Sequence, residues 1–380
     1  MILFEHGPGG VPALFDGARE VIVARRADQV RPALARADRA RGAGGWLAGY
    51  VAYEAGYALE PKLAPRMPRR RPGPLVLLGV FDGPQVADRV LARAGAEAGE
   101  ARLSPLRRGI SRAAYGAAIA RVMGYIAAGD CYQINLTFPL SARLEAGTAL
   151  GLYGALRARQ AVGYGVFCDL GVGPVVMSRS PELFFRVEGG VISARPMKGT
   201  APRDADPARD AALAAALQLS EKARAENLMI VDLLRNDIAR ISEVGSVKVP
   251  ELYAVEPYAT VHQMSSTVQG RLVAGADLAG LMAALFPCGS ITGAPKIRAM
   301  EIIAEVEGRA RGVYCGAMGW MAPGGDAVWN VAIRTLSLFP GGRVRLNVGG
   351  GVVQDSTAAG EWEEALWKAR YAEGLGATSG

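Results

Sequence analysis

A β-hairpin pattern in the middle of the chain constrains the fold most. Residues 182–188 and 191–194 form two short, mostly apolar runs, and the Gly189-Gly190 pair between them is a typical two-residue turn. Residues 132–138 add a strand in which apolar and polar side chains strictly alternate. Hairpins join antiparallel strands, so these patterns predict an antiparallel sheet rather than a series of βαβ units.

The remaining elements come in blocks of strands and blocks of helices. Further strands are expected at residues 21–24, 46–51, 75–81, 164–170, 175–178, 245–249, 261–268, 313–321, 328–339 and 343–348. Helices are expected at residues 28–41, 148–159, 208–219, 221–241, 278–286, 295–307 and 358–373, with one more between a Ser111 cap and Gly129. This order favours an α+β fold with a large, mostly antiparallel sheet system covered by helices.

The Ala/Gly/Arg-rich segment 92–108 is the best linker candidate. It separates an N-terminal part, residues 1–105, from a larger region, residues 106–375. A chain of 380 residues is long enough to form one large domain or two, and we expect the two parts to form one structural domain.

Composition narrows the class of protein. Half of the residues are apolar and 21% are charged, as in globular proteins. The net charge of +7 fits either a nucleic acid or a small anionic substrate, and the Arg69-Arg70-Arg71 run is expected to be a solvated loop. The four cysteines lack metal-ligand spacing and are expected to be thiols in a reducing compartment. Without a visible signal peptide or a long uncharged apolar run, we expect a cytoplasmic protein with no membrane partner.

Lys198 follows the hairpin and is the first candidate for chemistry. It lies between Pro196, which restricts the backbone, and Gly199, which allows another group to approach closely. Such a lysine could be a nucleophile or an anion-binding group on a braced turn. A lone lysine in a loop is more often solvated, so this motif alone does not decide between the two interpretations.

Acidic residues on two predicted helices form a candidate metal site. Glu361, Glu364 and Lys368 share one face of the last helix, and Glu226 lies on the predicted helix 221–241. Such a group is commonly a solvated row of ion pairs. Three converging carboxylates would suit Mg²⁺, which keeps some of its waters and accepts an anionic substrate oxygen.

Two further segments suggest that an anion binds. Residues 286–296, FPCGSITGAPK, are expected to expose backbone N–H groups at a helix N-terminus, although the glycine spacing is not that of a P-loop. Tyr314 and Arg334 lie on predicted strands, and residues 349–351 are three glycines. An arginine, a tyrosine and glycine amides can clamp a carboxylate. The polar face made by Gln133, Asn135 and Thr137 is either a cleft wall or an ordinary exposed surface.

Taken together, these segments resemble the chorismate-utilising enzymes. The matching stretches are GDCYQINLTF, SRSPELFF, RPMKGTAPR, RAENLMIVDLLRNDIARI, FPCGSITGAPKIRAMEII, RGVYCGAMGW, WNVAIRTL, VGGGVVQDS and EWEEALWKAR, in the family order from about residue 110 to 372. The resemblance implies two packed, mostly antiparallel sheets covered by helices, with the active site in the cleft. It makes residues 106–375 the chorismate-binding catalytic region.

Three positions indicate a branch of this family. Lys198 in the P-M-K-G-T run is similar to the lysine of aminodeoxychorismate synthases, where anthranilate synthases have alanine. Gln133 stands where isochorismate and salicylate synthases use a lysine to activate water. Gln263 aligns with a catalytic histidine of anthranilate synthases, and His262 is one position away, on the opposite face of a strand. The resemblance therefore implies amination of chorismate at C4 through a covalent Lys198 intermediate, with the Lys198 pKa lowered by burial or by Arg195.

The same resemblance implies roles for the other candidate residues. Glu182 would be the acid or base at the C4 hydroxyl, and Lys368 would pair with the ring carboxylate. The residues implied to hold Mg²⁺ are Glu226, Glu361 and Glu364. The residues implied to contact the substrate are Gln133, Thr292, Tyr314, Arg334, Gly349, Gly351 and Lys368.

No glutaminase signature is present, so the resemblance implies a separate glutamine amidotransferase subunit as the source of ammonia. The product, 4-amino-4-deoxychorismate, leads to 4-aminobenzoate and folate. Anthranilate synthase component I is the nearest alternative. A non-catalytic or nucleic-acid-binding protein is an alternative of another class.

Overall fold

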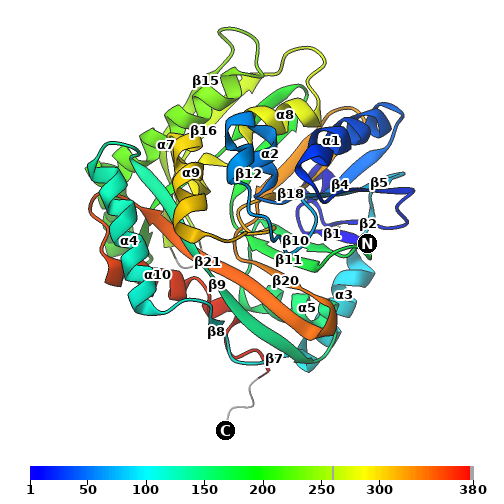
Figure 1. The fold of residues 1–380 in the computed structure, drawn as a ribbon, viewed down its shortest axis with the longest axis horizontal. Coiled ribbons are helices and arrows are strands. Elements are labelled where there is room, and N and C mark those ends of the chain that lie inside the picture. Colours follow the sequence, from blue (N-terminus) through cyan, green and yellow to red (C-terminus); the bar gives the residue numbers. More distant parts are fainter. Residues whose placement is uncertain (259–260, 377–380) are drawn as a thin grey trace.

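In the computed structural model, which describes residues 1–258 and 261–376, two antiparallel sheets pack against each other with helices outside (Figure 1). The larger sheet of the described residues has eleven strands: β1 (Ile2–Phe4), β2 (Ala13–Phe15), β6 (Gln85–Val86), β7 (Arg102–Leu103), β8 (Arg107–Arg108), β9 (Gln133–Ala146), β10 (Tyr164–Cys168), β11 (Val175–Ser180), β17 (Gly293–Ala294), β20 (Thr335–Leu338) and β21 (Arg343–Val352). This arrangement confirms the predicted α+β fold.

The second sheet has ten strands among the same residues and contains the predicted hairpin. Its strands are β3 (Glu20–Ala24), β4 (Trp46–Val51), β5 (Val76–Phe81), β12 (Leu183–Glu188), β13 (Val191–Ala194), β14 (Met197–Pro202), β15 (Lys248–Pro257), β16 (Val261–Arg271), β18 (Ala317–Met321) and β19 (Ala327–Val331). The β12–β13 pair turns at Gly189-Gly190, where both glycines have positive φ angles that other residues rarely adopt. Residues 1–105 contribute strands to both sheets.

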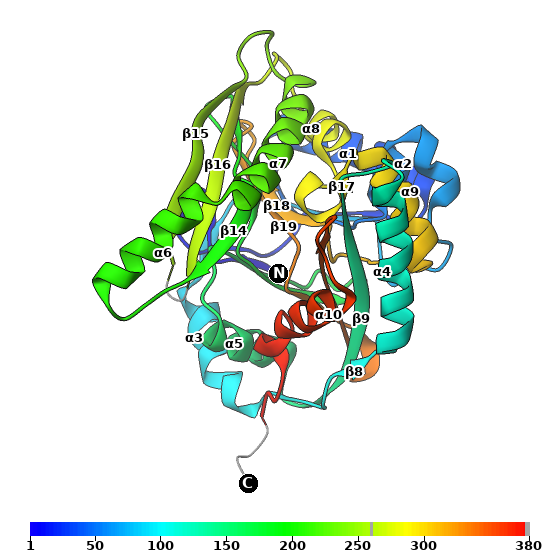
Figure 2. The same ribbon diagram turned by 90° about the vertical axis from the view of Figure 1, so that its left-hand side faces the viewer.

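The helices cover the outer faces of the sheets. They are α1 (Ala27–Gly42), α2 (Ala55–Leu59), α3 (Asp88–Glu97), α4 (Arg112–Ala127), α5 (Ala149–Arg159), α6 (Pro207–Leu219), α7 (Glu221–Ala239), α8 (Leu278–Leu285), α9 (Lys296–Glu307) and α10 (Ala358–Trp367). In Figure 2, α7 lies along β14 and β16, and α4 lies along β9. No helix in the described part is both long and apolar enough to cross a membrane.

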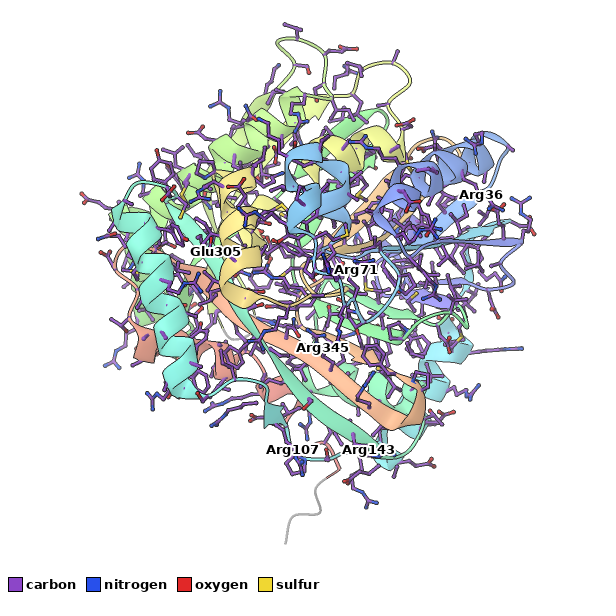
Figure 3. The ribbon with its side chains drawn as sticks, in the orientation of Figure 1. Arg36, Arg71, Arg107, Arg143, Glu305 and Arg345 are labelled. Carbon is purple, nitrogen blue, oxygen red and sulfur yellow. The ribbon has the colours of Figure 1, made fainter. Side chains whose placement is uncertain are left out.

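Local sequence explains why several helices form where they do. The Ser111 hydroxyl accepts a hydrogen bond from the Ala114 N–H, which caps α4 as predicted. Glu305 on α9, labelled in Figure 3, accepts hydrogen bonds from Arg121 and Tyr125 on α4 at 2.6 and 2.7 Å. These contacts fix α4 beside α9, at the edge where β9 carries its polar residues.

Three expectations about local structure were wrong. Segment 92–108 is not a linker, because α3 packs on α5, and β7 and β8 pair with β9. Lys198 lies on strand β14 rather than on a turn, because residues 197–202 pair with β16. Tyr314 and Arg334 lie just outside β18 and β20 rather than on strands.

Candidate active site

A cavity of about 160 Å³ lies between the two sheets and contains most of the predicted residues. Its walls come from β9 and β21 of the larger sheet, from β14 and the start of β12 of the other, and from the end of α10. The lining residues are Asn135, Glu182, Met197, Lys198, Ser290, Ile291, Tyr314, Ile333, Arg334, Asn347, Val348, Gly349, Gly351, Lys368 and Tyr371. Segments that are far apart in the sequence therefore meet at one solvent-filled site.

Lys198 extends from an irregular part of β14 into this cavity. The pairing of β14 with β16 shifts register between Met197 and Thr200, and Gly199 has a φ of 84° at the irregularity. A Cβ atom at Gly199 would lie 2.8 Å from the Ala223 side chain, so glycine is needed there for packing as well. The Gln263 amide donates a hydrogen bond to the Gly199 carbonyl at 2.8 Å, and this contact supports the backbone beside Lys198.

The surroundings of the Lys198 amine favour its neutral form. The Nζ atom donates a hydrogen bond to Gln133 Oε1 at 3.2 Å. Burial lowers the pKa of Lys198, the Lys368 ammonium lowers it further, and the Glu182 and Glu226 carboxylates oppose the shift. Arg195 does not have the predicted role, because its guanidinium pairs with Glu256 on β15.

Glu182 is the buried carboxyl group of the cavity. Its residue is only 8% exposed, and its Oε1 accepts a hydrogen bond from the Ser290 hydroxyl at 2.6 Å. Burial raises the pKa of Glu182, while the Ser290 hydrogen bond and the positive charge of Lys198 lower it. The pKa of Glu182 is thus raised and that of Lys198 is lowered, so the two values move toward each other, as is typical of an acid–base pair in an active site.

Tyr314, Arg334 and the glycines of β21 form the predicted anion-binding end of the cavity. Arg334 has a φ of 50°, which is unusual for a residue with a side chain and is often found at functional positions. Its backbone carbonyl accepts a hydrogen bond from the Arg179 N–H at 2.9 Å. Within the described ranges, the Arg334 guanidinium makes no hydrogen bond or ion pair, so its donors are available to a ligand.

The polar residues of β9 have different surroundings. Asn135 lines the cavity, and Gln133 accepts a hydrogen bond from the cavity residue Lys198. The Thr137 N–H and hydroxyl both donate to Glu307 Oε1, at 2.8 and 3.0 Å, in the interior. Of the two alternatives that the sequence left open, a cleft wall therefore fits Asn135, whereas Thr137 is neither a cleft wall nor an exposed surface.

Two of the predicted metal ligands, Glu361 and Glu364, lie beside Gly350 of β21, and the third, Glu226, lies on α7. Glu361 Oε1 accepts a hydrogen bond from Ser356 at 2.6 Å, whereas its buried Oε2 has no partner among residues 1–258 and 261–376. A Cβ atom at Gly350 would come within 2.7 Å of this oxygen. Burial raises the pKa of Glu361, and the negative charges of Glu364 and Glu226 raise it further. An unpaired carboxylate oxygen among like charges is a suitable ligand for a hard cation.

Lys368 has two partners in this structure. Its Nζ atom pairs with Glu364 Oε1 at 2.7 Å and donates a hydrogen bond to the Gly349 carbonyl at 3.0 Å. Within the described sequence, no three acidic, histidine or cysteine side chains lie close enough together to hold a metal ion. Water or substrate oxygens would have to complete the coordination.

The Gly-rich segment 286–296 is arranged differently from the prediction. Ser290 and Ile291 line the cavity from a short 3₁₀ turn, but the N-terminus of α9 is not part of the lining. The Thr292 hydroxyl donates to the Cys288 carbonyl at 2.7 Å and is fully buried, so its side chain does not face the cavity. Lys296 pairs with the buried Asp237 and holds the segment against α7.

His262 and Gln263 point to opposite sides of β16, as the sequence suggested. His262 Nε2 lies 2.9 Å from Asp210 Oδ1 on α6, away from the cavity. Gln263 faces β14, where it contacts Gly199 and Thr200. Neither side chain lines the cavity.

Several residues around the cavity were missed from the sequence. Ser290, Asn347 and Tyr371 line it, and a fully buried Glu307–Arg311 ion pair of 2.7 Å lies behind it. Glu307 is the last residue of α9 and Arg311 lies beyond the helix, so no local pattern indicated that the two would form a buried pair.

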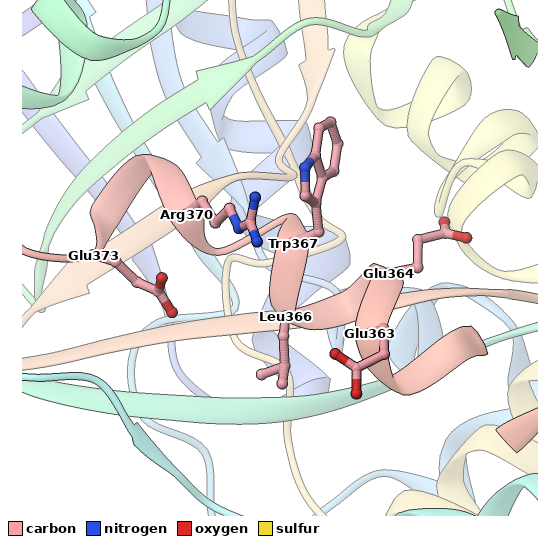
Figure 4. Close-up of a pocket in the computed structure, with 6 residues that line it drawn as sticks. All are labelled: Glu363, Glu364, Leu366, Trp367, Arg370 and Glu373. Atoms are coloured by element: carbon pink, nitrogen blue, oxygen red, sulfur yellow. The ribbon is translucent and has the colours of Figure 1, made fainter. Parts of the chain in front are cut away.

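A larger surface hollow, of about 490 Å³, lies on the outer side of α10 (Figure 4). Glu363, Leu366, Trp367 and Arg370 surround it, and Glu364 stands at its border. Apart from Glu364 it contains none of the predicted residues. The predicted residues that line a hollow therefore gather mainly at the smaller cavity between the sheets.

Comparisons with known proteins agree with this geometry. A family model described as chorismate binding enzyme matches residues 6–373. The chain is 44% identical to aminodeoxychorismate synthase component 1 of Klebsiella aerogenes over 70% of its length, and 41% identical to anthranilate synthase component 1 of Streptomyces coelicolor over 80%. These matches span 58% and 57% of the two relatives, so the chain covers little more than half of their length.

A solved structure supports the same relationship. Anthranilate synthase component I from Streptococcus pneumoniae superposes with a TM-score of 0.78 at 26% identity, covering 94% of this chain and 91% of that one. The fold, the contents of the cavity and the family match over nearly the whole sequence lead to one conclusion. The chain is a member of the chorismate-binding enzyme family.

Proposed function

We propose that the chain is the chorismate-aminating component of an aminodeoxychorismate synthase. The observation that carries this proposal is the Lys198 amine, which extends into the cavity within 3.2 Å of Gln133 and in an environment that lowers its pKa. A neutral amine is a nucleophile. Relatives named aminodeoxychorismate synthase component 1 are among the similar proteins, which adds support.

In the first step, the Lys198 nitrogen forms a bond to C2 of chorismate. The ring double bonds shift, and the bond between C4 and its hydroxyl breaks. Glu182, held by Ser290, donates a proton so that the hydroxyl leaves as water. Burial raises the pKa of Glu182, which favours the protonated form that this step requires.

In the second step, ammonia forms a bond to C4, the double bonds shift back, and the bond between C2 and the Lys198 nitrogen breaks. Glu182, now a carboxylate, accepts a proton from the incoming ammonium. The product is 4-amino-4-deoxychorismate, and the lysine is regenerated. Gln133 has no basic group, so water at this wall would not be activated as a competing nucleophile.

The two carboxylates of chorismate would bind at opposite ends of the cavity. Arg334, Tyr314 and the Gly351 backbone are suited to the enolpyruvyl carboxylate. Glu226, Glu361 and Glu364 would hold Mg²⁺, and bound Mg²⁺ would neutralise the ring carboxylate together with Lys368. The unpaired Glu361 Oε2 is the observation that fits this ion.

Ammonia would come from a glutamine amidotransferase partner, since the similar proteins are named as component 1. The experiment that tests the proposal is an incubation with chorismate, Mg²⁺ and ammonium, followed by mass spectrometry of the product. 4-Amino-4-deoxychorismate is expected. Fluorescent anthranilate, formed without any added lyase, would instead identify an anthranilate synthase and refute the proposal.

A further inference from the structure

Tyr371 carries an unsatisfied polar group at the wall of the cavity. It lies in the 3₁₀ turn Arg370–Ala372 that follows α10, and its side chain lines the cavity. The hydroxyl is shielded from bulk solvent and has no hydrogen-bond partner in the described part of the chain. Buried polar groups are nearly always paired, so an unpaired hydroxyl at a binding cavity indicates that a ligand supplies the partner.

Arg334 is the second unpaired donor on the same wall. Its guanidinium makes no contact with an acceptor among residues 1–258 and 261–376. Both side chains line the same cavity, and the positive charges of Arg334 and Arg179 oppose the rise that burial causes in the pKa of the Tyr371 hydroxyl. Arg334 also has a φ of 50°, a backbone conformation that side-chain-bearing residues rarely adopt away from functional positions.

The chemistry of the two groups defines their ligand. A guanidinium only donates hydrogen bonds, and a tyrosine hydroxyl beside a cation is best used as a donor. Two convergent donors, one of them charged, match the two oxygens of a carboxylate. A carbonyl or a hydroxyl ligand would leave the charge of Arg334 without a counter-ion.

We infer that the Tyr371 hydroxyl donates a hydrogen bond to the same substrate carboxylate that Arg334 binds. This inference rests on the proposed function, in which that group is the enolpyruvyl carboxylate of chorismate. Tyr371 is then a substrate-binding residue that distinguishes chorismate from ring acids without the side chain. No sequence motif pointed to it.

The test compares Tyr371→Phe with the wild-type chain. Phenylalanine keeps the ring and removes only the hydroxyl. The matched control is Tyr50→Phe, because the Tyr50 hydroxyl is also buried and unpaired but lies in the smaller core cluster, away from the cavity. Chorismate binding is measured by calorimetry without ammonia, and thermal unfolding is measured without ligand.

Tyr371→Phe is expected to weaken chorismate binding roughly 10- to 150-fold, because it loses one hydrogen bond to a charged group. The melting temperature of the free variant is expected to equal that of the free wild type. Tyr50→Phe is expected to bind chorismate like the wild type. Unchanged binding by Tyr371→Phe would overturn the inference. A lower melting temperature of free Tyr371→Phe would also overturn it, because the hydroxyl would then have a partner within the protein.

A second ligand tests which of the two carboxylates of chorismate the Tyr371 hydroxyl contacts. A cyclohexadiene carboxylate that has a hydroxyl in place of the enolpyruvyl ether is expected to bind equally to the wild type and to Tyr371→Phe. Weaker binding of this analogue by Tyr371→Phe would contradict the assignment to the enolpyruvyl carboxylate. If the wild type neither bound nor aminated chorismate, the proposed function itself would be wrong. Calorimetry of the wild type therefore distinguishes that failure from a failure of the Tyr371 inference.

Discussion

Replacing Arg311 by methionine is predicted to destabilise the protein and to disturb the cavity from behind. The Arg311 guanidinium donates hydrogen bonds to Glu307 at 2.7 and 3.1 Å and to the carbonyls of Asn135 and Ile291 at 2.6 and 3.2 Å. The Arg311 and Glu307 side chains are each 1% exposed. Removing the cation leaves a buried carboxylate whose remaining hydrogen-bond donor, among the residues that the structure describes, is Thr137.

Breaking a buried ion pair in this way typically costs about 3–5 kcal/mol of unfolding free energy. The double variant Glu307→Met/Arg311→Met removes both charges, so most of this loss should be recovered. The Thr137 N–H would stay unpaired and cost about 1–3 kcal/mol. Urea unfolding of the two single variants and the double variant measures these differences and their coupling.

Asn135 and Ile291 line the cavity, so the recovered double variant should still bind chorismate more weakly. Its KM should rise even though its melting temperature recovers most of the loss seen in Arg311→Met. The reasoning would be refuted if Arg311→Met lost less than about 1 kcal/mol, or if the losses of the two single variants simply added in the double variant.

Three further predictions follow from the buried carboxyl groups. Glu182→Gln should lower kcat about 10²- to 10⁴-fold. It should also remove the decline of activity at high pH, because the wild-type acid, whose pKa is raised, loses its proton as pH rises; a pH–rate profile tests both effects. Glu361→Gln should raise the Mg²⁺ concentration needed for half-maximal activity, and unchanged metal dependence would exclude this ligand. The pKa of Glu54 is raised by burial from 4.5 to about 7, so the folded state binds this proton more tightly than the unfolded state. Stability should therefore fall by up to about 3 kcal/mol between pH 4.5 and 7, and urea unfolding of Glu54→Gln should lack that slope.

The sequence predicted those parts of the fold that depend on local patterns. The alternation of residues 132–138 identified the start of β9, and Ser111 marked the start of α4. Gly189-Gly190 identified the β12–β13 hairpin, because these two glycines themselves determine the turn. Lys198 and Glu182 were found through motifs, and they line one cavity.

Contacts between distant segments could not be predicted from such patterns. Segment 92–108 has the composition of a linker, but α3 is held in place by packing on α5. Glu307 ends α9 and Arg311 lies beyond it, and their pairing and burial depend on distant segments such as Asn135 and Thr137 of β9. Tyr371 has no motif, because its proposed role depends on Arg334, which lines the same cavity.

The central proposal is that the Lys198 nitrogen forms a covalent bond with chorismate. The most direct measurement is mass spectrometry of the protein after incubation with chorismate and Mg²⁺ in the absence of ammonia. We predict an adduct equal in mass to chorismate less one water, located on the peptide that contains Lys198 and missing in Lys198→Ala. Full amination activity of Lys198→Ala, with no adduct on the wild-type protein, would contradict the proposal.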